Sequence, residues 1–541
     1  MASEERTSST PIITPTADST AAIRQRRIQR GGLRMGRGYT GNPGETPPGA
    51  SVTEPRTSHR AADADQRLIG LATWVVFGLA AWRLILLATS PLGLHGDEAQ
   101  YWVWAQTPDW GYYSKPPLIA WLIWASTALL GDTPFGVRAS VPLIHAATAL
   151  ILMSLGRAMG GARAGALAAV LFASLPGISV SALLMTTDVP LLFFYAAASL
   201  CLWHALETDR WRWWLGFGAA LGLGILAKFA MGMLLVSLLA SLLLLGKRQS
   251  ISASRVLGAL GLAVLIYANN LLWQWNADFA SFRHVSQDAK VEGSGFNPLS
   301  ALEFLGSQFG VFGPLLFAAL LVLMARAIRD RRHWFLTLLI LPQLLTMTAV
   351  ALLGEANANW AAMVYAPAAV LVALWLADAG RFTRPVLIGS LALHLSLAVA
   401  IPAVEPVTRL TGIDLPGDPF RRLRGWDQMG EAIARIHATD PDAVILVEER
   451  MLFASLAFAI RPMPDLAMWN PNRRIDNHFE MTASIERFPG RRFLLVAWSP
   501  EPTGIIPHFQ SWRHEGAVSV PTGGGRLRRY HLHWLEGYRG R

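Results

Sequence analysis

The residues best suited to chemistry lie in one aromatic segment, which begins at His95 and reads HGDEAQYWVWAQTPDWGYYSKPP. Asp97 and Glu98 are adjacent there, and a carboxylate held at such a place can take a proton from an attacking hydroxyl. Aromatic rings favour the headgroup level of a membrane and also stack on sugar rings; the tyrosines of this segment are Tyr101, Tyr112 and Tyr113. Spacing alone fits a simpler role for both acids equally well, as caps of a short helix.

Two lysines and a second acid interrupt apolar stretches, which predicts that each has a partner or a task. Lys115 precedes residues 116–130, an apolar run too short to span comfortably, which we expect to lie as a helix in the interface. Lys228 breaks a longer run, and an ionisable group at such a depth costs roughly 2.5–3.5 kcal/mol on insertion scales. A lipid phosphate would partner both lysines, although Lys115 also fits an ordinary snorkelling side chain. Asp188 fits either a site residue or the N-cap of the helix that follows it.

Two later polar segments offer further candidates for contacts with a substrate. Residues 276–292 contain Arg283 beside His284, which suits phosphate or metal binding, and suits an ordinary surface loop as well. Glu355 and Asn359 belong to a short polar turn, which can either hydrogen-bond a sugar or headgroup or cap two helices. All of these groups are predicted at the same face of a membrane, where a substrate that is part sugar, part phosphate and part lipid would meet them.

The composition identifies the elements that must position these residues as membrane-spanning helices. Of the 541 residues, 52% are hydrophobic and only 16% are charged, and the mean hydropathy is +0.34. A soluble chain carries closer to a quarter charged residues, and apolar runs such as residues 334–353 reach the ~20 residues that cross a bilayer. The net charge of +10 is concentrated in the N-terminal tail and in short loops, which indicates a topology signal and argues against nucleic acid as a partner.

We predict an all-α polytopic membrane bundle followed by a small α/β domain. Residues 1–67 are expected to form a disordered basic tail, and residues 68–403 the bundle, with a long first outer loop at 90–138. Residues 404–541 carry strand-like runs at 443–447 and 492–497, which predict the α/β domain on the outer face. About eleven spans are expected, near 68–89, 139–156, 164–185, 189–206, 213–227, 229–245, 256–275, 304–325, 334–353, 361–378 and 385–403.

The basic residues orient this bundle. Alternate connections hold clusters of arginine and lysine, and the connections between them hold only isolated ones. By the positive-inside rule, the N-terminus is cytoplasmic, and the first loop and the C-terminal domain are outside the cell membrane. We therefore expect a multi-pass protein of the bacterial inner membrane with a periplasmic site.

Several blocks of the sequence, taken in order, resemble one known superfamily. The blocks are GDEAQYW (96–102), YYSKPPLIAWLIW (112–124), FGVR (135–138), TTDVPLLFF (186–194), ILAKF (225–229), WNADFASFRH (275–284) and EANANWAAMVY (355–365). They resemble the bacterial branch of the protein O-mannosyltransferase and aminoarabinose transferase superfamily, which is similar to glycosyltransferase family 39 and has the GT-C architecture. The resemblance covers roughly residues 68–380 and implies that fold.

The resemblance also implies roles for particular residues. The acidic position of the family's first loop falls on Asp97, with Glu98 beside it, and the second acidic position falls on Asp188. The family's phosphate-facing lysine falls on Lys115, and a further basic position falls on Lys228. These two lysines, with Arg283, are the expected contacts of the donor phosphate, and the expected substrate contacts are Tyr101, Tyr112, Tyr113 and Asn359.

A divalent metal is a candidate cofactor on the same basis. His284 matches a loop histidine that contributes to a metal site in the aminoarabinose branch. That branch, however, has an acidic residue before the lysine of the Lys-Pro pair, where this chain has Ser114. No other cofactor is expected.

These features predict an inverting glycosyltransferase that uses a polyprenyl-phosphate sugar. Its acceptor would be a hydroxyl of lipid A or lipopolysaccharide, of another cell-envelope glycan, or of a protein. Such a donor carries its own activated sugar, and the sequence contains no P-loop or dinucleotide fingerprint. The alternative is a transporter or flippase for a lipid-linked or small polar substrate, which should place its ionisable residues near the bilayer midplane in interrupted helices.

Overall fold

The computed structural model describes residues 56–245, 250–288, 295–378, 380–413 and 418–540. The helical bundle and the C-terminal sheet both belong to one compact unit, Arg60–Arg541. Residues 1–55 of the predicted basic tail, which was expected to span residues 1–67, lie outside the described residues.

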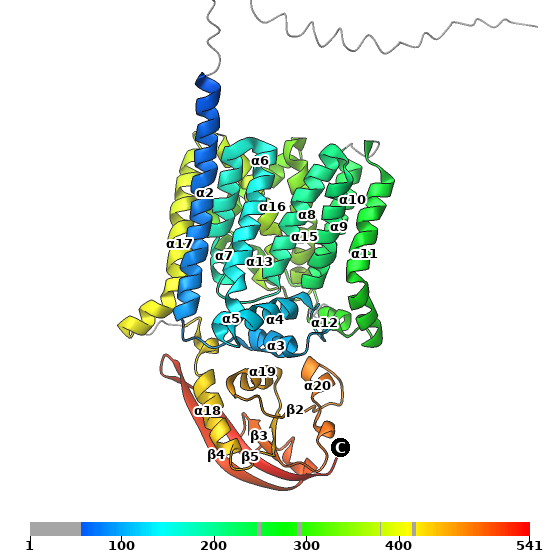
Figure 1. The fold of residues 1–541 in the computed structure, drawn as a ribbon, viewed down its shortest axis with the longest axis vertical. Helices are drawn as coiled ribbons and strands as arrows, with labels where there is room; N and C mark the ends of the chain where they lie inside the picture. The colour runs from blue at the N-terminus through cyan, green and yellow to red at the C-terminus, as the bar shows by residue number, and fades with distance from the viewer. Residues whose placement is uncertain (1–55, 246–249, 289–294, 379, 414–417, 541) are drawn as a thin grey trace, which may run out of the picture. The chain divides into compact units, whose positions relative to one another are not determined.

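A bundle of apolar helices makes up most of this unit (Figure 1). Its principal helices are α2 (Arg56–Thr89), α6 (Ser140–Ser174), α8 (Asp188–Thr208), α9 (Trp211–Ala227), α10 (Leu234–Leu244), α11 (Ala253–Asn276), α13 (Pro298–Val311), α14 (Pro314–Ala327), α15 (Trp334–Leu353), α16 (Tyr365–Ala377) and α17 (Thr383–Thr411). The centre is α16, of which most side chains are buried against α6 and the other helices around it. The predicted helical membrane bundle is thus confirmed.

The number of full-length spans is lower than the eleven predicted. Among the described residues, seven helices are long and apolar enough to cross a membrane, or up to eight if the bent pair of α13 and α14 counts as one span. Those two helices meet at 117° around Gly313, and the α9 helix ends where Lys228 interrupts the apolar sequence. Of the other predicted spans, those at 139–156 and 164–185 fall largely in the single helix α6, and those at 213–227 and 229–245 correspond to the shorter helices α9 and α10.

Helix α6 includes the spans predicted separately at 139–156 and, in large part, at 164–185. Gly161 has a φ of 82°, in the left-handed region, and breaks the helix there. A Cβ on Gly156 would lie 3.0 Å from the backbone oxygen of Ala164, so the two arms fold back and pack against each other. A side chain at Gly165 would likewise meet the backbone of Met153 at 2.6 Å. Small residues therefore allow the close hairpin between the spans predicted at 139–156 and 164–185.

Short helices of residues 90–138, the segment predicted as the first outer loop, lie across one end of the bundle (Figure 1). They are α3 (Gly96–Gln106), α4 (Leu118–Leu130) and α5 (Pro134–Arg138). The 3-10 helix η1 (Phe229–Met233), α12 (Ala280–Asp288) and the 3-10 helix η4 (Ala358–Val364) line a cavity together with α3, whereas α7 (Pro176–Ser181) packs against α17. The short apolar run at 116–130 thus forms a helix, α4, across the end of the bundle.

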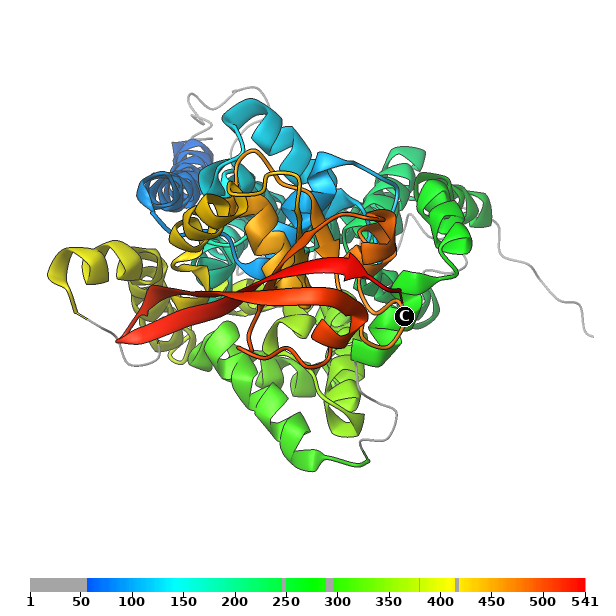
Figure 2. The same ribbon diagram turned by 90° about the horizontal axis from the view of Figure 1, so that it is seen from below.

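The C-terminal segment folds into the predicted small α/β domain. Its elements are α18 (Trp426–His437), β1 (Val444–Val447), α19 (Arg450–Ala459), β2 (Leu466–Met468), α20 (His478–Thr482), β3 (Phe493–Ala497), β4 (Phe509–Gly523) and β5 (Arg526–Tyr538). The sheet order is β2-β1-β3-β5-β4, in which β1 is parallel to both neighbours and β5 is antiparallel to β3 and β4. Figure 2 shows β4 and β5 as one long hairpin across the sheet domain.

The first outer loop and the sheet domain share a hydrophobic core. Trp102 of α3 packs edge-on against Phe458 of α19, with ring centroids 5.0 Å apart, and the guanidinium of Arg461 lies 4.2 Å from the Trp102 ring centre. The same core includes Val189 at the start of α8. This packing fixes α3 between the bundle and the sheet domain, so residues at its N-terminus meet side chains from both.

Candidate active site

A cavity of about 710 Å³ lies where α3, α8, η1, η4 and α19 meet. Most of the predicted site residues line it, namely Asp97, Glu98, Tyr101, Lys115, Asp188, Lys228, His284 and Asn359. It falls in the ordinary size range of small-molecule sites, roughly 300–1,000 Å³. Residues from five separate parts of the sequence therefore form one site.

The N-terminus of α3 places Asp97 and Glu98 differently. His95 is the N-cap; its Nδ1 accepts a hydrogen bond of 3.3 Å from the backbone N–H of Asp97. Glu98 completes a capping box by accepting from the His95 backbone N–H at 2.9 Å. The Asp97 carboxylate has no part in this cap, so the capping role considered for it from the sequence is taken by its neighbours.

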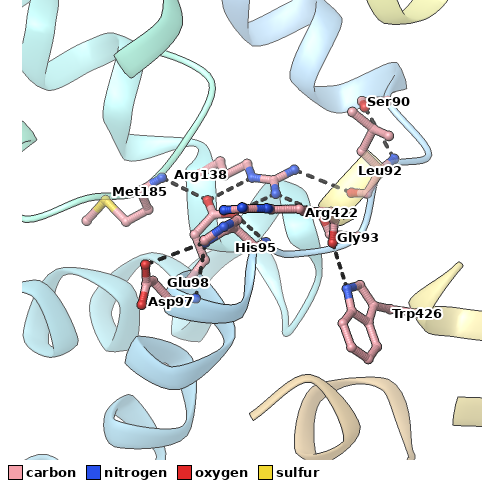
Figure 3. A network of polar contacts seen from close by, with 10 residues as sticks. All are labelled: Ser90, Leu92, Gly93, His95, Asp97, Glu98, Arg138, Met185, Arg422 and Trp426. Carbon is pink, nitrogen blue, oxygen red and sulfur yellow. Dashed lines mark hydrogen bonds and ion pairs between the residues drawn. The ribbon is translucent and has the colours of Figure 1, made fainter. Parts of the chain in front are cut away.

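Glu98 is the centre of a buried polar network (Figure 3). Its side chain is 2% exposed, and it forms a bidentate ion pair with Arg138, which donates from Nε at 2.9 Å and from Nη2 at 2.6 Å. The backbone N–H of Met185 donates to the same carboxylate at 2.8 Å. Arg138 also donates to the backbone oxygens of Leu92 and Gly93. With these bonds the carboxylate is saturated, and it ties α3 to the end of the first helix and to the segment before α8.

Asp97, in contrast, keeps much of its carboxylate open to the cavity. Its side chain is 41% exposed, with Oδ1 at 3.3 Å from Nη1 of Arg450 and Oδ2 at 3.6 Å from Nδ1 of His95. The same nitrogen of Arg450 donates to Oε1 of Gln100 at 3.0 Å. Asp97 is therefore held by the Arg450 guanidinium, while its oxygens still reach the cavity.

Asp188 and Lys228 form an ion pair in the wall opposite the sheet domain. Nζ of Lys228 donates to Oδ1 of Asp188 at 2.7 Å, and the side-chain amide of Asn359 donates to Oδ2 at 2.8 Å. The Asp188 side chain is 8% exposed and that of Lys228 is 21% exposed. Lys228 lies at the break between α9 and η1. Its ion pair with Asp188 holds its side chain at the surface of the cavity.

Lys115 and Tyr101 line the cavity from the first outer loop. The backbone oxygen of Lys115 accepts from the N–H of Tyr112, which closes the turn that precedes α4. Burial, with the nearby charge of Asp97, raises the pKa of the Tyr101 hydroxyl well above its usual value. Tyr101 therefore stays protonated and can act as a neutral hydrogen-bond donor.

Three predicted contacts are not among the residues that line the cavity. Tyr112 is buried, stacks on Trp104 with centroids 4.5 Å apart, and donates its hydroxyl hydrogen bond to the Trp104 backbone oxygen. Tyr113 donates its hydroxyl to the backbone oxygen of Ile475 in the sheet domain. Arg283 is 56% exposed and pairs with Asp278. The two tyrosines are engaged in packing between the α3 region and the sheet domain. Arg283 forms its ion pair with Asp278 and is not among the residues that line the cavity.

Among the residues that the structure describes, His284 is not part of a group that could hold a metal ion. His284 lines the cavity, and its ring centre lies 5.5 Å from that of Tyr113. Within the described part of the chain, no group of three His, Cys, Asp or Glu side chains is placed to hold a metal ion. Ser114 occupies the position at which the aminoarabinose branch has an acid, and a serine hydroxyl is a poor replacement for a carboxylate ligand.

Sequence reasoning missed the groups that hold Asp97. Arg450 belongs to the sheet domain and is separated from Asp97 by 353 positions, so no local pattern connects the two. His95 is separated from the acidic pair by Gly96 alone, and the capping-box spacing of His95 and Glu98 was a signal for its position. Arg138 stands in the block at 135–138, but nothing in the sequence paired it with Glu98.

Comparison with known proteins supports the resemblance. Residues 114–273 match the family described as dolichyl-phosphate-mannose-protein mannosyltransferase. The chain is 37% identical over 306 residues to the lipid A galacturonosyltransferase of Rhizobium johnstonii, which is 56% of this chain and 64% of that protein. It is also 28% identical over 211 residues to an undecaprenyl phosphate-alpha-4-amino-4-deoxy-L-arabinose arabinosyl transferase of Pseudomonas paraeruginosa, covering 34% of this chain and 38% of the relative.

A solved structure has the same fold. The crystal structure of ArnT from Cupriavidus metallidurans bound to undecaprenyl phosphate aligns with a TM-score of 0.62 at 16% identity, covering 86% of this chain and 98% of the other. The chain is therefore a multi-pass membrane protein with the GT-C fold. The predicted resemblance to the protein O-mannosyltransferase and aminoarabinose transferase superfamily is confirmed. The sequence match spans less than two thirds of the length of these curated relatives.

Proposed function

We propose that this protein is a glycosyltransferase that moves a sugar from a polyprenyl-phosphate donor to a hydroxyl acceptor. The observation that carries the proposal is the cavity at one end of the bundle, which combines an accessible carboxylate with two lysines. Its known relatives are named as transferases of sugars, and the ArnT structure contains undecaprenyl phosphate.

The donor phosphate binds Lys115 and Lys228 in this proposal. Both lysines line the cavity, and Lys228 is anchored by Asp188. Positive charge beside the phosphate stabilises the negative charge that grows on it as it leaves. The polyprenyl chain would lie along the apolar surface beside α4, which begins just after Lys115.

Asp97 is the general base. The acceptor hydroxyl oxygen attacks the anomeric carbon while its proton passes to an oxygen of Asp97, and the bond between the anomeric carbon and the phosphate oxygen breaks. The polyprenyl phosphate leaves with the bonding electrons, so one displacement inverts the anomeric configuration. Arg450 holds the carboxylate in position, His95 caps the backbone N–H of Asp97, and Asp188 and Glu98 act by fixing Lys228 and α3.

The acceptor is proposed to be the saccharide of lipid A or a related envelope glycolipid. The relative named as a lipid A galacturonosyltransferase supports this choice, since it is 37% identical to this chain over the aligned 306 residues. Purified protein in lipid nanodiscs, supplied with polyprenyl-phosphate sugars and lipid A, should yield lipid A heavier by one sugar in mass spectrometry. If none of the offered donors is consumed when lipid A, other envelope glycans or protein is present as acceptor, the proposed transferase activity is refuted.

A transporter is the less favoured alternative. The helix breaks at Lys228 and at Gly313 are features that transporters also have. However, the charged residues of the cavity gather where the outer loop and the sheet domain meet, and the relatives are named as transferases.

We further propose that the cavity and the sheet domain face the periplasm of a bacterial inner membrane, with the N-terminus in the cytoplasm. The support is the inward bias of arginine and lysine in the loops. A reporter fused after Val404 should be active on the periplasmic side, and one fused after Arg332 on the cytoplasmic side. The reverse pair of results would overturn this orientation.

A further inference from the structure

A second cavity, of about 360 Å³, lies on the sheet-domain side of the α3 N-terminus. It is lined by two arginines, a set of aromatic rings and one carboxylate; its residues are His95, Gly96, Arg422, Trp426, Glu449, Met451, Leu452, Trp498, Arg528 and Tyr530. Nothing in the proposed transfer uses these arginines or rings, so their arrangement requires a separate explanation.

This cavity adjoins the proposed active site. His95 lines both cavities, and successive residues of α3 divide between them, with Gly96 in the second and Asp97 in the first. The start of α19 does the same, since Arg450 lines the first cavity and Met451 the second. A molecule bound in the second cavity would therefore lie directly beside the proposed base.

The two arginines give the second cavity an excess of positive charge. Arg528 donates to the backbone oxygens of Arg424 and Arg422 and lies 3.8 Å from the centre of the Trp426 ring. Arg422 forms no hydrogen bond or ion pair through its guanidinium among the described residues, and Figure 3 shows it beside His95. Glu449, the single carboxylate in the lining, faces the indole N–H of Trp498 at 3.3 Å.

The aromatic rings complete a surface suited to a sugar. Trp498 is 54% exposed, and its ring centre lies 4.3 Å from that of Tyr530. An exposed indole beside guanidinium groups offers a flat apolar face for a sugar ring and planar donors for a phosphate or carboxylate. Burial, with the nearby positive charge of Arg421, lowers the pKa of Arg528, while Tyr530 and Glu449 oppose the shift; the hydrogen bonds of its guanidinium go to backbone oxygens.

We propose that the second cavity binds the anionic saccharide headgroup of the acceptor and presents one of its hydroxyls to Asp97. Arg422 contacts the phosphate or carboxylate of the headgroup, and Trp498 stacks on its sugar ring. The assignment rests on the proposed function only in naming the headgroup as the acceptor, since binding itself requires no transfer.

The test uses the full-length protein in nanodiscs and a soluble probe, the phosphorylated glucosamine disaccharide without acyl chains. Binding is measured for the wild type, Arg422→Ala, Arg422→Lys and Trp498→Ala. The matched control is Arg421→Ala, which removes the same charge from the adjacent position outside the cavity lining. We expect Arg422→Ala to weaken binding roughly tenfold or more, because it removes a charged hydrogen bond, and Arg422→Lys to retain part of the affinity.

Further arms identify the ligand. The wild type should bind the dephosphorylated disaccharide and inorganic phosphate more weakly than the probe. Trp498→Ala should weaken the binding of both the phosphorylated and the dephosphorylated disaccharide. The proposal is overturned if the wild type does not bind the probe, if inorganic phosphate binds as well as the probe, or if Arg421→Ala and Arg422→Ala weaken binding equally.

Kinetics separate this proposal from the proposed function. If transfer to lipid A occurs, Arg422→Ala should raise the KM for lipid A and leave the KM for the donor unchanged. Transfer with an unchanged KM for lipid A would remove the second cavity from acceptor binding while the transferase stands. Binding that depends on Arg422 without any transfer would leave the headgroup site in place and refute the transferase.

Discussion

Substituting Glu98 by alanine should loosen the α3 N-terminus more than any other single change in the first outer loop. The carboxylate accepts four hydrogen bonds, two from the Arg138 guanidinium and two from the backbone N–H groups of His95 and Met185. Both side chains of the ion pair are nearly fully buried, at 3% and 2% exposed. Glu98→Ala would leave a buried guanidinium without its counter-charge.

The cost follows from these contacts. Removing one partner of a buried ion pair costs about 3–5 kcal/mol, because the remaining charge stays desolvated. Arg138 still donates to the backbone oxygens of Leu92 and Gly93, which limits the loss, whereas the two freed backbone N–H groups add to it. We therefore expect about 3–5 kcal/mol for Glu98→Ala and a smaller loss for Glu98→Gln, since its amide oxygen can still accept some of the bonds.

The assay is unfolding of the purified protein in mixed micelles, with sugar transfer measured on the same samples below the unfolding transition. Glu98→Ala should lower both stability and turnover, because the same helix end holds Asp97. Glu303→Ala is the control, since Glu303 is exposed and its removal should change stability by no more than about 0.5 kcal/mol. If Glu98→Ala is as stable as this control, the network does not hold the loop in place.

Two further predictions concern the lysines of the cavity. Lys115→Ala should raise the KM for the donor roughly tenfold, and Lys115→Arg less, because the charge survives; Arg283→Ala, outside the cavity lining, should leave that KM unchanged. Equal effects of Lys115→Ala and Arg283→Ala in steady-state kinetics would contradict the phosphate role of Lys115. Lys228→Met should weaken the donor interaction and also destabilise the protein by about 1–3 kcal/mol, because it leaves the buried Asp188 carboxylate without its ion pair. The double variant with Asp188→Asn should recover part of that stability, and strict additivity in the unfolding measurements would show that the pair is not coupled.

The sequence predicted the bundle and the small α/β domain because both depend on local patterns. Apolar runs of sufficient length form helices wherever the backbone must satisfy its own hydrogen bonds. The runs at 443–447 and 492–497 became β1 and β3, which are fully buried. The number of full spans was overestimated, because the runs on either side of Lys228 form helices too short for a full span, and because composition does not show that the chain bends by 117° between α13 and α14.

The position of the candidate site was partly predictable for a different reason. Acids and lysines that interrupt apolar sequence at one membrane face must lie near each other once the helices pack, as Asp188 and Lys228 do. The partners of Asp97 were not predictable, because Arg450 approaches it only after the sheet domain packs on α3. The tyrosines at 112 and 113 had the composition of a sugar site, but packing against Trp104 and the Ile475 backbone engages them.

The central claim is that Asp97 accepts the acceptor proton, and Asp97→Asn tests it most directly. Asparagine keeps the shape and an oxygen for Arg450, and the partly exposed carboxylate is not the helix cap, so stability should change by no more than about 1 kcal/mol. The lost basic oxygen should lower kcat by ~10²–10⁴ while donor binding is retained. Purified Asp97→Asn protein, assayed for donor consumption with acceptor present, should therefore fold and bind but transfer almost nothing. Turnover within a few-fold of the wild type would contradict the mechanism.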